Sequence, residues 1–167
     1  VLKDGDIIGI DIGLRYKGWC GDACKTFMIG KVKPDVKKLV EIAKQCLYKG
    51  IHAADEGESI GAIGYAIQEF AENKGFSVVR EYGGHGIGRE LWEEPFIPHI
   101  GPKNRGPKLR AGMVINIEPM INIGKPDTRL MEDEWSVETA DKSFSAQFEH
   151  TIVITENGPD ILSIIPS

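Results

Sequence analysis

The sequence lacks the features that mark several large classes of protein. It has only three cysteines in 167 residues and no CxxC pair, which argues against a disulfide framework and favours reduced thiols in the cytoplasm. It has no apolar run long enough to span a bilayer and no signal-peptide pattern at its start, so no membrane association is expected. It also has no excess of positive charge, and its net charge of −5 argues against specific nucleic-acid binding.

The composition that is present is typical of one soluble globular domain. Hydrophobic residues make up 41% and charged residues 27% of the sequence. A chain of this length buries roughly 70% of its unfolded surface, and no repeat or linker divides it, so we expect a single domain over residues 1–167. Because the chain opens on Val1 in a strand-like approach, we expect it to be part of a longer protein.

The residue pattern predicts an α+β fold. A first helix is expected to begin at Pro34, and a second to begin after Ser59 and end at Gly75, because apolar residues recur there at helical spacing. Strands are expected where short apolar runs lie between turn residues: 6–13, 14–20, 24–30, 76–80, 113–118, 135–138 and 146–154. Strands, then two helices, then strands indicate helices packed on a curved, mainly antiparallel sheet.

Three acidic residues interrupt strands that otherwise look buried. By two-residue alternation, Asp11 shares a face with apolar neighbours, Glu118 lies on the face of Asn116, and Glu149 shares a face with Gln147 and Thr151. A charge in an apolar strand is costly unless it is paired or binds a metal. The sequence offers few nearby Lys or Arg for these carboxylates, so a shared cation is the economical explanation.

Two further residues complete the candidate set. Asp22 is placed at the turn into the third expected strand, and His85 lies among glycines that would let the backbone approach a ligand. Each residue alone has a simpler explanation, as a turn residue, a strand end or a structural histidine. Together they form an oxygen-rich set with one nitrogen, which suits Mn²⁺, Fe²⁺, Co²⁺ or Zn²⁺, and four carboxylates favour two ions over one.

In this order, the five residues resemble the methionine aminopeptidases of the pita-bread fold, in their short type I bacterial form. They lie in the segments IDIG, GDACKTF, GGHGIGRE, NIEPM and SAQFEHT, with separations of 11, 63, 33 and 31 residues. The resemblance covers essentially the whole chain. It implies an α+β pita-bread architecture with its N-terminal part incomplete, two divalent metal ions (Co, Mn, Fe, Zn or Ni), and removal of N-terminal methionine from nascent polypeptides.

The resemblance also implies a role for each residue. Asp11 would chelate one metal through both oxygens, Asp22 and Glu149 would bridge both ions, and His85 and Glu118 would complete the shell of the other. Glu118 would relay a proton to the leaving amine, so Glu118 and His85 are the expected catalytic residues. The amino terminus of the substrate would bind beside Asp11 and Asp22, which explains exopeptidase action.

The sequence departs from the family pattern near the expected substrate pocket. Trp92 stands where the family has a second histidine that contacts the substrate carbonyl, and an indole donates a hydrogen bond but carries no charge. Leu91 replaces a residue that is often Phe in the methionine pocket, and Trp135 matches the pocket-lining Trp of the family. We expect all three to contact substrate, and Trp92 to weaken or alter the activity.

Two alternatives stay open. An Xaa-Pro aminopeptidase or prolidase shares the five ligands, but those relatives carry additional histidine motifs and wider ligand spacing. A pita-bread binding protein generally loses the ligands, all of which are present here. The basic stretch Lys103–Arg110 is interpreted as a solvated loop and not as a phosphate site, and contact of this loop with the ribosome surface is left open. We otherwise expect a monomer that meets nascent polypeptide N-termini.

Overall fold

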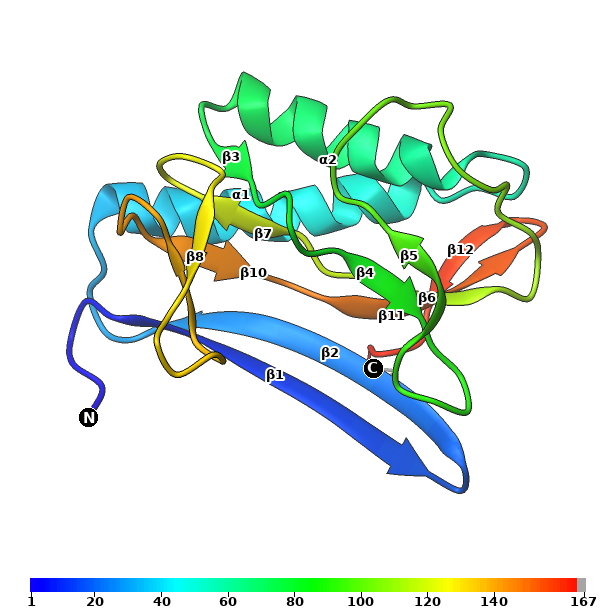
Figure 1. Cartoon of the computed structure of the whole chain (residues 1–167), viewed down its shortest axis with the longest axis horizontal. Helices are drawn as coiled ribbons and strands as arrows, with labels where there is room; N and C mark the ends of the chain where they lie inside the picture. Colours follow the sequence, from blue (N-terminus) through cyan, green and yellow to red (C-terminus); the bar gives the residue numbers. More distant parts are fainter. Residues whose placement is uncertain (165–167) are drawn as a thin grey trace.

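Two helices lie on one side of the molecule and a long β-hairpin lies on the other (Figure 1). The computed structural model describes residues 1–164. The helices are α1 (Pro34–His52) and α2 (Ile60–Asn73), and the hairpin consists of β1 (Ile7–Tyr16) and β2 (Trp19–Met28). Both helices begin where the sequence predicts, and α2 ends close to the predicted Gly75. Among the residues described, neither helix is long and apolar enough to cross a membrane.

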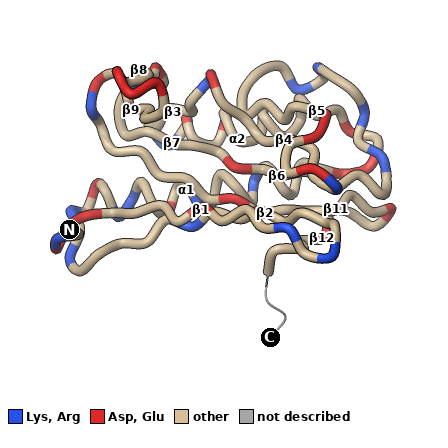
Figure 2. Tube along the Cα trace, turned by 60° about the horizontal axis from the view of Figure 1, so that its bottom comes forward, with Lys and Arg blue, Asp and Glu red and all other residues tan. Residues whose placement is uncertain are grey.

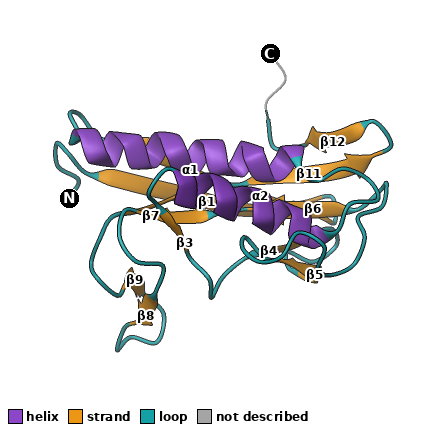
Figure 3. Ribbon diagram, turned by 90° about the horizontal axis from the view of Figure 1, so that it is seen from above, coloured by secondary structure: helices purple, strands orange, loops and turns teal. Residues whose placement is uncertain are grey.

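The remaining strands are short and pair in antiparallel fashion. They are β3 (Ser77–Val78), β4 (Gly84–Gly86), β5 (Glu93–Ile97), β6 (Val114–Ile117), β7 (Met120–Asn122), β8 (Thr128–Leu130), β9 (Val137–Thr139), β10 (Ser145–Gln147), β11 (His150–Thr155) and β12 (Gly158–Ile161). One sheet has the order β12-β11-β6-β4-β5 and another the order β10-β7-β3. The small β8–β9 hairpin stands away from the helices (Figure 3). The predicted α+β class with antiparallel strands is therefore confirmed.

The core lies between the helices and the strands. Leu39 of α1, Ile63 of α2, and Ile117 and Ile152 of the five-stranded sheet are all 0% exposed. Burying one such side chain contributes about 1.5–3 kcal/mol. The helices approach closely at Gly50, where a Cβ atom would stand 2.7 Å from the Cδ1 atom of Ile67. This packing holds β6 and β11 in fixed positions.

The prediction of three short strands over residues 6–30 is wrong. The structure has two ten-residue strands, paired from Ile7 with Met28 to Tyr16 with Trp19. The turn lies at Lys17 and Gly18, where φ is 49° and 80°, as a tight hairpin turn requires. Gly13, which looked like a strand end, lies inside β1. Asp22 consequently lies within a strand and not at a turn.

The loop before β6 covers the beginning of α2. Ser59 occupies the N-cap position, but its hydroxyl donates to the carbonyl of Lys103 instead of capping its own helix. The first amides of the helix are satisfied by the same loop: Ile60 donates to Pro107 at 3.0 Å and Gly61 to Arg105 at 2.9 Å. The basic stretch is a loop, as expected, but it packs against a helix end. Lys and Arg positions are otherwise dispersed along the chain (Figure 2).

Candidate metal centre

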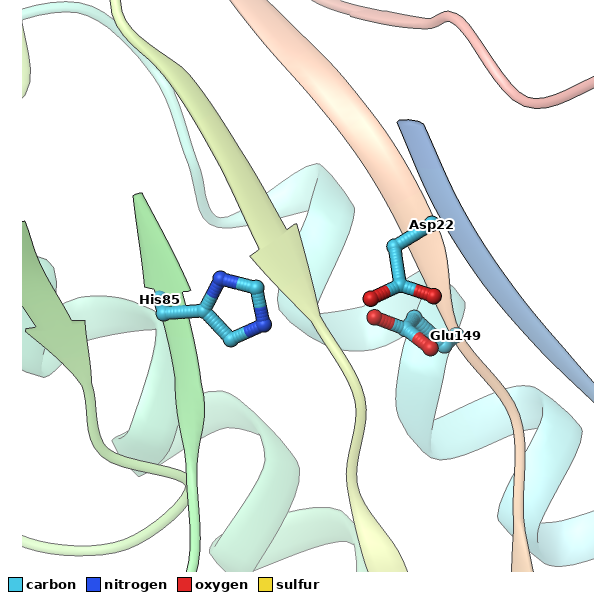
Figure 4. Close-up of side chains that lie close together, drawn as sticks. All are labelled: Asp22, His85 and Glu149. Atoms are coloured by element: carbon cyan, nitrogen blue, oxygen red, sulfur yellow. The ribbon is translucent and has the colours of Figure 1, made fainter. Parts of the chain in front are cut away.

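Three side chains from distant parts of the sequence meet beneath the five-stranded sheet. Asp22 comes from β2, His85 from β4, and Glu149 from the residue before β11. One ligand atom from each lies within 4.8 Å of the others. Figure 4 shows the two carboxylates facing each other and the imidazole ring pointing toward them. The group is formed by tertiary packing alone.

The other two predicted ligands border this group. The Oε1 atom of Glu118 lies 3.6 Å from the Nε2 atom of His85. Asp11 pairs with Cys24 in the hairpin register, which places it diagonally from Asp22 on the same face. Asp11 and Glu118 also line one cleft with His85. The structure therefore brings all five predicted residues together, although Asp11 lies on an exposed strand and not on the buried one expected from its sequence.

The histidine is held in the tautomer that can bind a metal. Its Nδ1 atom lies 2.9 Å from the carbonyl oxygen of Gly86, which can only accept a hydrogen bond. The Nδ1 atom must therefore carry the proton, and the Nε2 atom presents a lone pair to the carboxylates. The Nδ2 atom of Asn116 lies 3.5 Å from that Nε2 atom.

The carboxylates are poorly compensated by the protein. Burial, followed by the charges of neighbouring carboxylates, raises the pKa of Glu149 to about 9 and the pKa of Glu118 to about 8. Burial and the charge of Asp11 also raise the pKa of Asp22. The Oδ1 atom of Asp22 is buried and finds no hydrogen-bond partner among residues 1–164. Within residues 1–164, no ion pair of a Lys or Arg involves any of the five residues.

These observations fit a divalent cation. Clustered carboxylates, a free imidazole lone pair and an unpartnered buried oxygen are the donors that a Mn²⁺, Fe²⁺, Co²⁺ or Zn²⁺ ion uses. The nearby thiol of Cys24 is not suited to this role in the metal-free protein, because burial raises its pKa to about 12. The prediction of an oxygen-rich site thus matches the chemistry of the groups that meet here.

The glycines around His85 have a different function from the one expected. A Cβ atom at Gly84 would collide with the carbonyl oxygen of Asn116, and one at Gly86 with the carbonyl oxygen of Glu94. The segment is strand β4, squeezed between β6 and β5, and not a loop open to a ligand. The glycines bring strands together, and the imidazole side chain is only 12% exposed.

Two polar residues that were not predicted as functional, one buried and one half-buried, support the five. His99 is 1% exposed, and its Nε2 atom accepts a hydrogen bond from the backbone N–H of Glu118 at 3.2 Å. Burial lowers the pKa of His99 to about 3, so it is neutral. Gln147 donates from its Nε2 atom to the Oε2 atom of Glu118 at 3.1 Å. The sequence could have indicated Gln147, because two-residue alternation places it on the face of Glu149. No pattern in the sequence pointed to His99.

The three predicted substrate residues lie in different places. Trp92 is 73% exposed, lines the cleft of about 540 Å³ that Asp11, His85 and Glu118 also line, and has its ring centroid 6.3 Å from that of His85. Leu91 lies in an adjoining hollow against Gly13. Trp135 is 87% exposed between β8 and β9 and is not part of the cleft lining. Their contact with substrate stays a prediction.

Comparison with known proteins identifies the family. The model of metallopeptidase family M24 matches residues 1–156. The chain belongs to this family. Methionine aminopeptidase 1 of Bacillus subtilis is 52% identical over 163 residues, which are 98% of this chain and 66% of that protein. The chain thus spans just under two thirds of that relative.

Solved M24 structures agree with the fold. The crystal structure of methionine aminopeptidase from Rickettsia prowazekii superposes with a TM-score of 0.96 at 44% identity, covering 98% of this chain and 66% of that chain. The predicted pita-bread fold is therefore confirmed. Prolidase from Pyrococcus furiosus gives a TM-score of 0.79 at 25% identity, over 99% of this chain and 43% of that chain. The methionine aminopeptidases are the nearer comparison, so the prolidase alternative is not favoured.

Proposed function

We propose that this chain carries the metal centre of a methionine aminopeptidase, which removes the initiator methionine from nascent polypeptides in the cytoplasm. The observation that carries the proposal is the meeting of Asp22, His85 and Glu149 within 4.8 Å, with Asp11 and Glu118 beside them. The similarity to named methionine aminopeptidases supports the choice of substrate.

The five side chains would hold two divalent ions. Four carboxylates carry more negative charge than one divalent ion offsets, and the raised pKa values of Glu118 and Glu149 indicate that this charge is not offset by the protein. When bound, such ions would supply Lewis acidity, which polarises a peptide carbonyl and lowers the pKa of water, so that water can lose a proton and attack as hydroxide near neutral pH.

Glu118 is the proposed proton carrier. Gln147 binds its Oε2 atom, and the backbone amide of Glu118 is held by His99, so the Oε1 atom is presented toward His85. A carboxyl group fixed in this way can accept a proton from the attacking water and deliver it to the leaving amine. His85, with its Nδ1 proton bound to Gly86, keeps its Nε2 atom aimed into the site.

The exposed position of Asp11 explains how an amino terminus would be selected. Asp11 lies on the hairpin at the cleft, where a free α-ammonium group could approach its carboxylate. An internal peptide bond offers no such charge, so the chain would cut only at the first residue. Trp92 lies at the same cleft and would contact the substrate near the reacting carbonyl.

The test is release of methionine from a Met-Ala-Ser peptide with Mn²⁺ or Co²⁺ supplied. Glu118→Gln should abolish release, because the side chain can no longer carry the proton, whereas Glu156→Gln, an exposed position in the β11–β12 turn, should not. Release that persists in Glu118→Gln would contradict the proposed role. Cleavage of Ala-Pro in preference to Met-Ala-Ser would instead support the prolidase alternative.

A further inference from the structure

The strand that carries Asp22 is joined to the segment that carries Glu149 in an unusual way. Strand β2 runs alongside β10 and the start of β11 (Figure 1), but it shares no continuous ladder with them. The direct backbone connection is a single bridge at Lys25 and Phe148, with the amide of Glu149 donating to the carbonyl of Cys24 at 2.9 Å. On either side of this bridge, threonine side chains make the connection.

Thr151 connects the two segments on one side of the bridge. Its Oγ1 atom accepts a hydrogen bond from the backbone N–H of Asp22 at 3.2 Å. The same hydroxyl lies 2.8 Å from the carbonyl oxygen of Asp22 and 2.8 Å from the Oδ1 atom of Asn116, and these two acceptors share its single proton. Thr151 is 4% exposed, so water does not compete for these bonds.

Thr26 makes the reciprocal connection on the other side. Its Oγ1 atom donates to the carbonyl oxygen of Gln147 at 2.7 Å and accepts from the backbone N–H of Gln147 at 3.2 Å. Thr26 is also 4% exposed. Each hydroxyl therefore bonds both the N–H and the carbonyl group of the residue opposite. Thr26 reaches from β2 to Gln147, and Thr151 reaches from β11 to Asp22. Two side-chain oxygens stand where two backbone-to-backbone rungs would otherwise be.

The threonine pair (Thr26 and Thr151) contacts residues that carry or adjoin the ligands of the metal centre. Asp22 is held through its own backbone, Glu149 lies between the two contacts, and Gln147 contacts Glu118. Thr151 also binds the Oδ1 atom of Asn116, which leaves the Nδ2 atom of Asn116 directed at the Nε2 atom of His85. An oxygen atom inserted between two backbones keeps them farther apart than direct pairing would, which leaves room for the carboxylates.

We propose that Thr26 and Thr151 are positioning residues of the metal centre. They set the separation and register of β2 and the segment 147–151, and so fix the carboxylate of Asp22 relative to that of Glu149. The consequence for metal binding rests on the proposed function, but the positioning itself rests on the hydrogen bonds alone. Groups that orient the ligands of a metal commonly change its affinity about 10–100-fold when removed.

The first test measures the positioning without metal. Thr151→Val keeps the shape of the side chain and removes the hydroxyl, as does Thr26→Val. Hydrogen exchange followed by NMR should show faster exchange of the Asp22 amide in Thr151→Val and of the Gln147 amide in Thr26→Val. Thr155→Val is the matched control, because its hydroxyl contacts only the β11–β12 turn. Unchanged exchange at both amides would overturn the proposal.

The second test measures the consequence with Co²⁺. The Val variants should bind Co²⁺ about 10–100-fold more weakly and with altered visible absorption, whereas Thr151→Ser and Thr26→Ser, which keep the hydroxyl, should resemble the parent. Folded Val variants with the parent's affinity and spectrum would contradict the proposal. If a Val variant fails to fold, the Ser variant at the same position is the test. A Co²⁺ absorption spectrum like that of the parent supports the role of the hydroxyl, and loss of that spectrum refutes it.

Asp22→Asn separates this proposal from the proposed function. It should weaken Co²⁺ binding because it removes a ligand directly. If Asp22→Asn leaves Co²⁺ binding unchanged, the proposed metal centre is wrong, while the amide exchange of the Val variants still decides whether the threonine pair positions β2.

Discussion

The helix-covered sheet and the β1–β2 hairpin contribute to the same site but are built in opposite ways. In the sheet, Ile117 and Ile152 are 0% exposed beneath α1 and α2. In the hairpin, Ile12 and Leu14 are 56% and 55% exposed. Two predicted ligands, Asp11 and Asp22, come from the hairpin. The other three come from the sheet: His85 lies in β4, Glu118 directly follows β6 and Glu149 directly precedes β11. Stability thus resides mainly in one region, whereas the site needs both.

This contrast indicates what each region can tolerate. A change in the sheet should act on folding, and a change in the hairpin should act on the position of its ligands. The hairpin is connected to the segment 147–151 by the threonine pair and one backbone bridge, so its ligands depend on a few contacts. The following substitutions test the contrast, beginning with the largest expected change in free energy.

Truncation of the core should cost the most. Ile152→Ala should lower the free energy of unfolding by about 2–5 kcal/mol, because it leaves a cavity in the buried core. Ile12→Ala, on the exposed hairpin face, should change it by less than about 0.5 kcal/mol. Chemical denaturation of the metal-free protein measures both. Equal losses of unfolding free energy in the two variants would contradict the contrast between the sheet and the hairpin.

Removal of one ligand from each region should have the next largest effect. Glu149→Ala and Asp22→Ala should each lower metal affinity at least about 100-fold, equivalent to about 2.7 kcal/mol. Metal content after dialysis, measured by atomic emission, is the readout, and Asp160→Ala, at the exposed residue of strand β12, is the control. Unchanged metal content in both ligand variants would contradict the assignment.

The pH dependence follows from the raised pKa values of Glu118 and Glu149, about 8 and about 9. The folded metal-free protein keeps these protons above pH 4.5, the ordinary carboxyl value, whereas the unfolded chain loses them. Its free energy of unfolding should therefore fall as the pH rises toward 8–9.

Metal binding should show the opposite trend over the same pH range. Because a metal must displace these protons, its affinity should rise with pH, by up to about tenfold per unit for each proton released. Calorimetry in buffers of different ionisation enthalpy counts the protons. Glu118→Gln should remove part of the release, and a pH-independent affinity in the parent would count against burial of these carboxylates.

Substitution of Trp92 should have the smallest effect and tests the cleft itself. Trp92→His should raise the turnover of Met-Ala-Ser several-fold, about 1 kcal/mol in activation free energy, because an imidazole can donate a proton as well as a hydrogen bond. Trp19→His, at an exposed tryptophan that begins β2 and does not line the cleft, is the control. An equal or lower rate in Trp92→His would show that the indole suits this site.

The sequence predicted what depends on local periodicity. Helical spacing located α1 and α2, and carboxylates in apolar strands singled out Asp11, Glu118 and Glu149. The position of the hairpin turn was missed because Gly13 and Gly18 look alike until φ is known. His99 and the threonine pair were missed because their partners are distant in sequence: Thr151 and Asp22 are 129 residues apart. Such pairings follow from tertiary packing, which no local pattern encodes.

The cover on the first turn of α2 has a consequence for the order of folding. The acceptors for Ser59, Ile60 and Gly61 come from Lys103, Pro107 and Arg105, about 44 residues later. A helix capped by its own side chain can form before the rest of the chain collapses. The first turn of α2 instead depends on closing a loop over that distance. Its hydrogen bonds are therefore completed only after the segment 103–107 has folded against it.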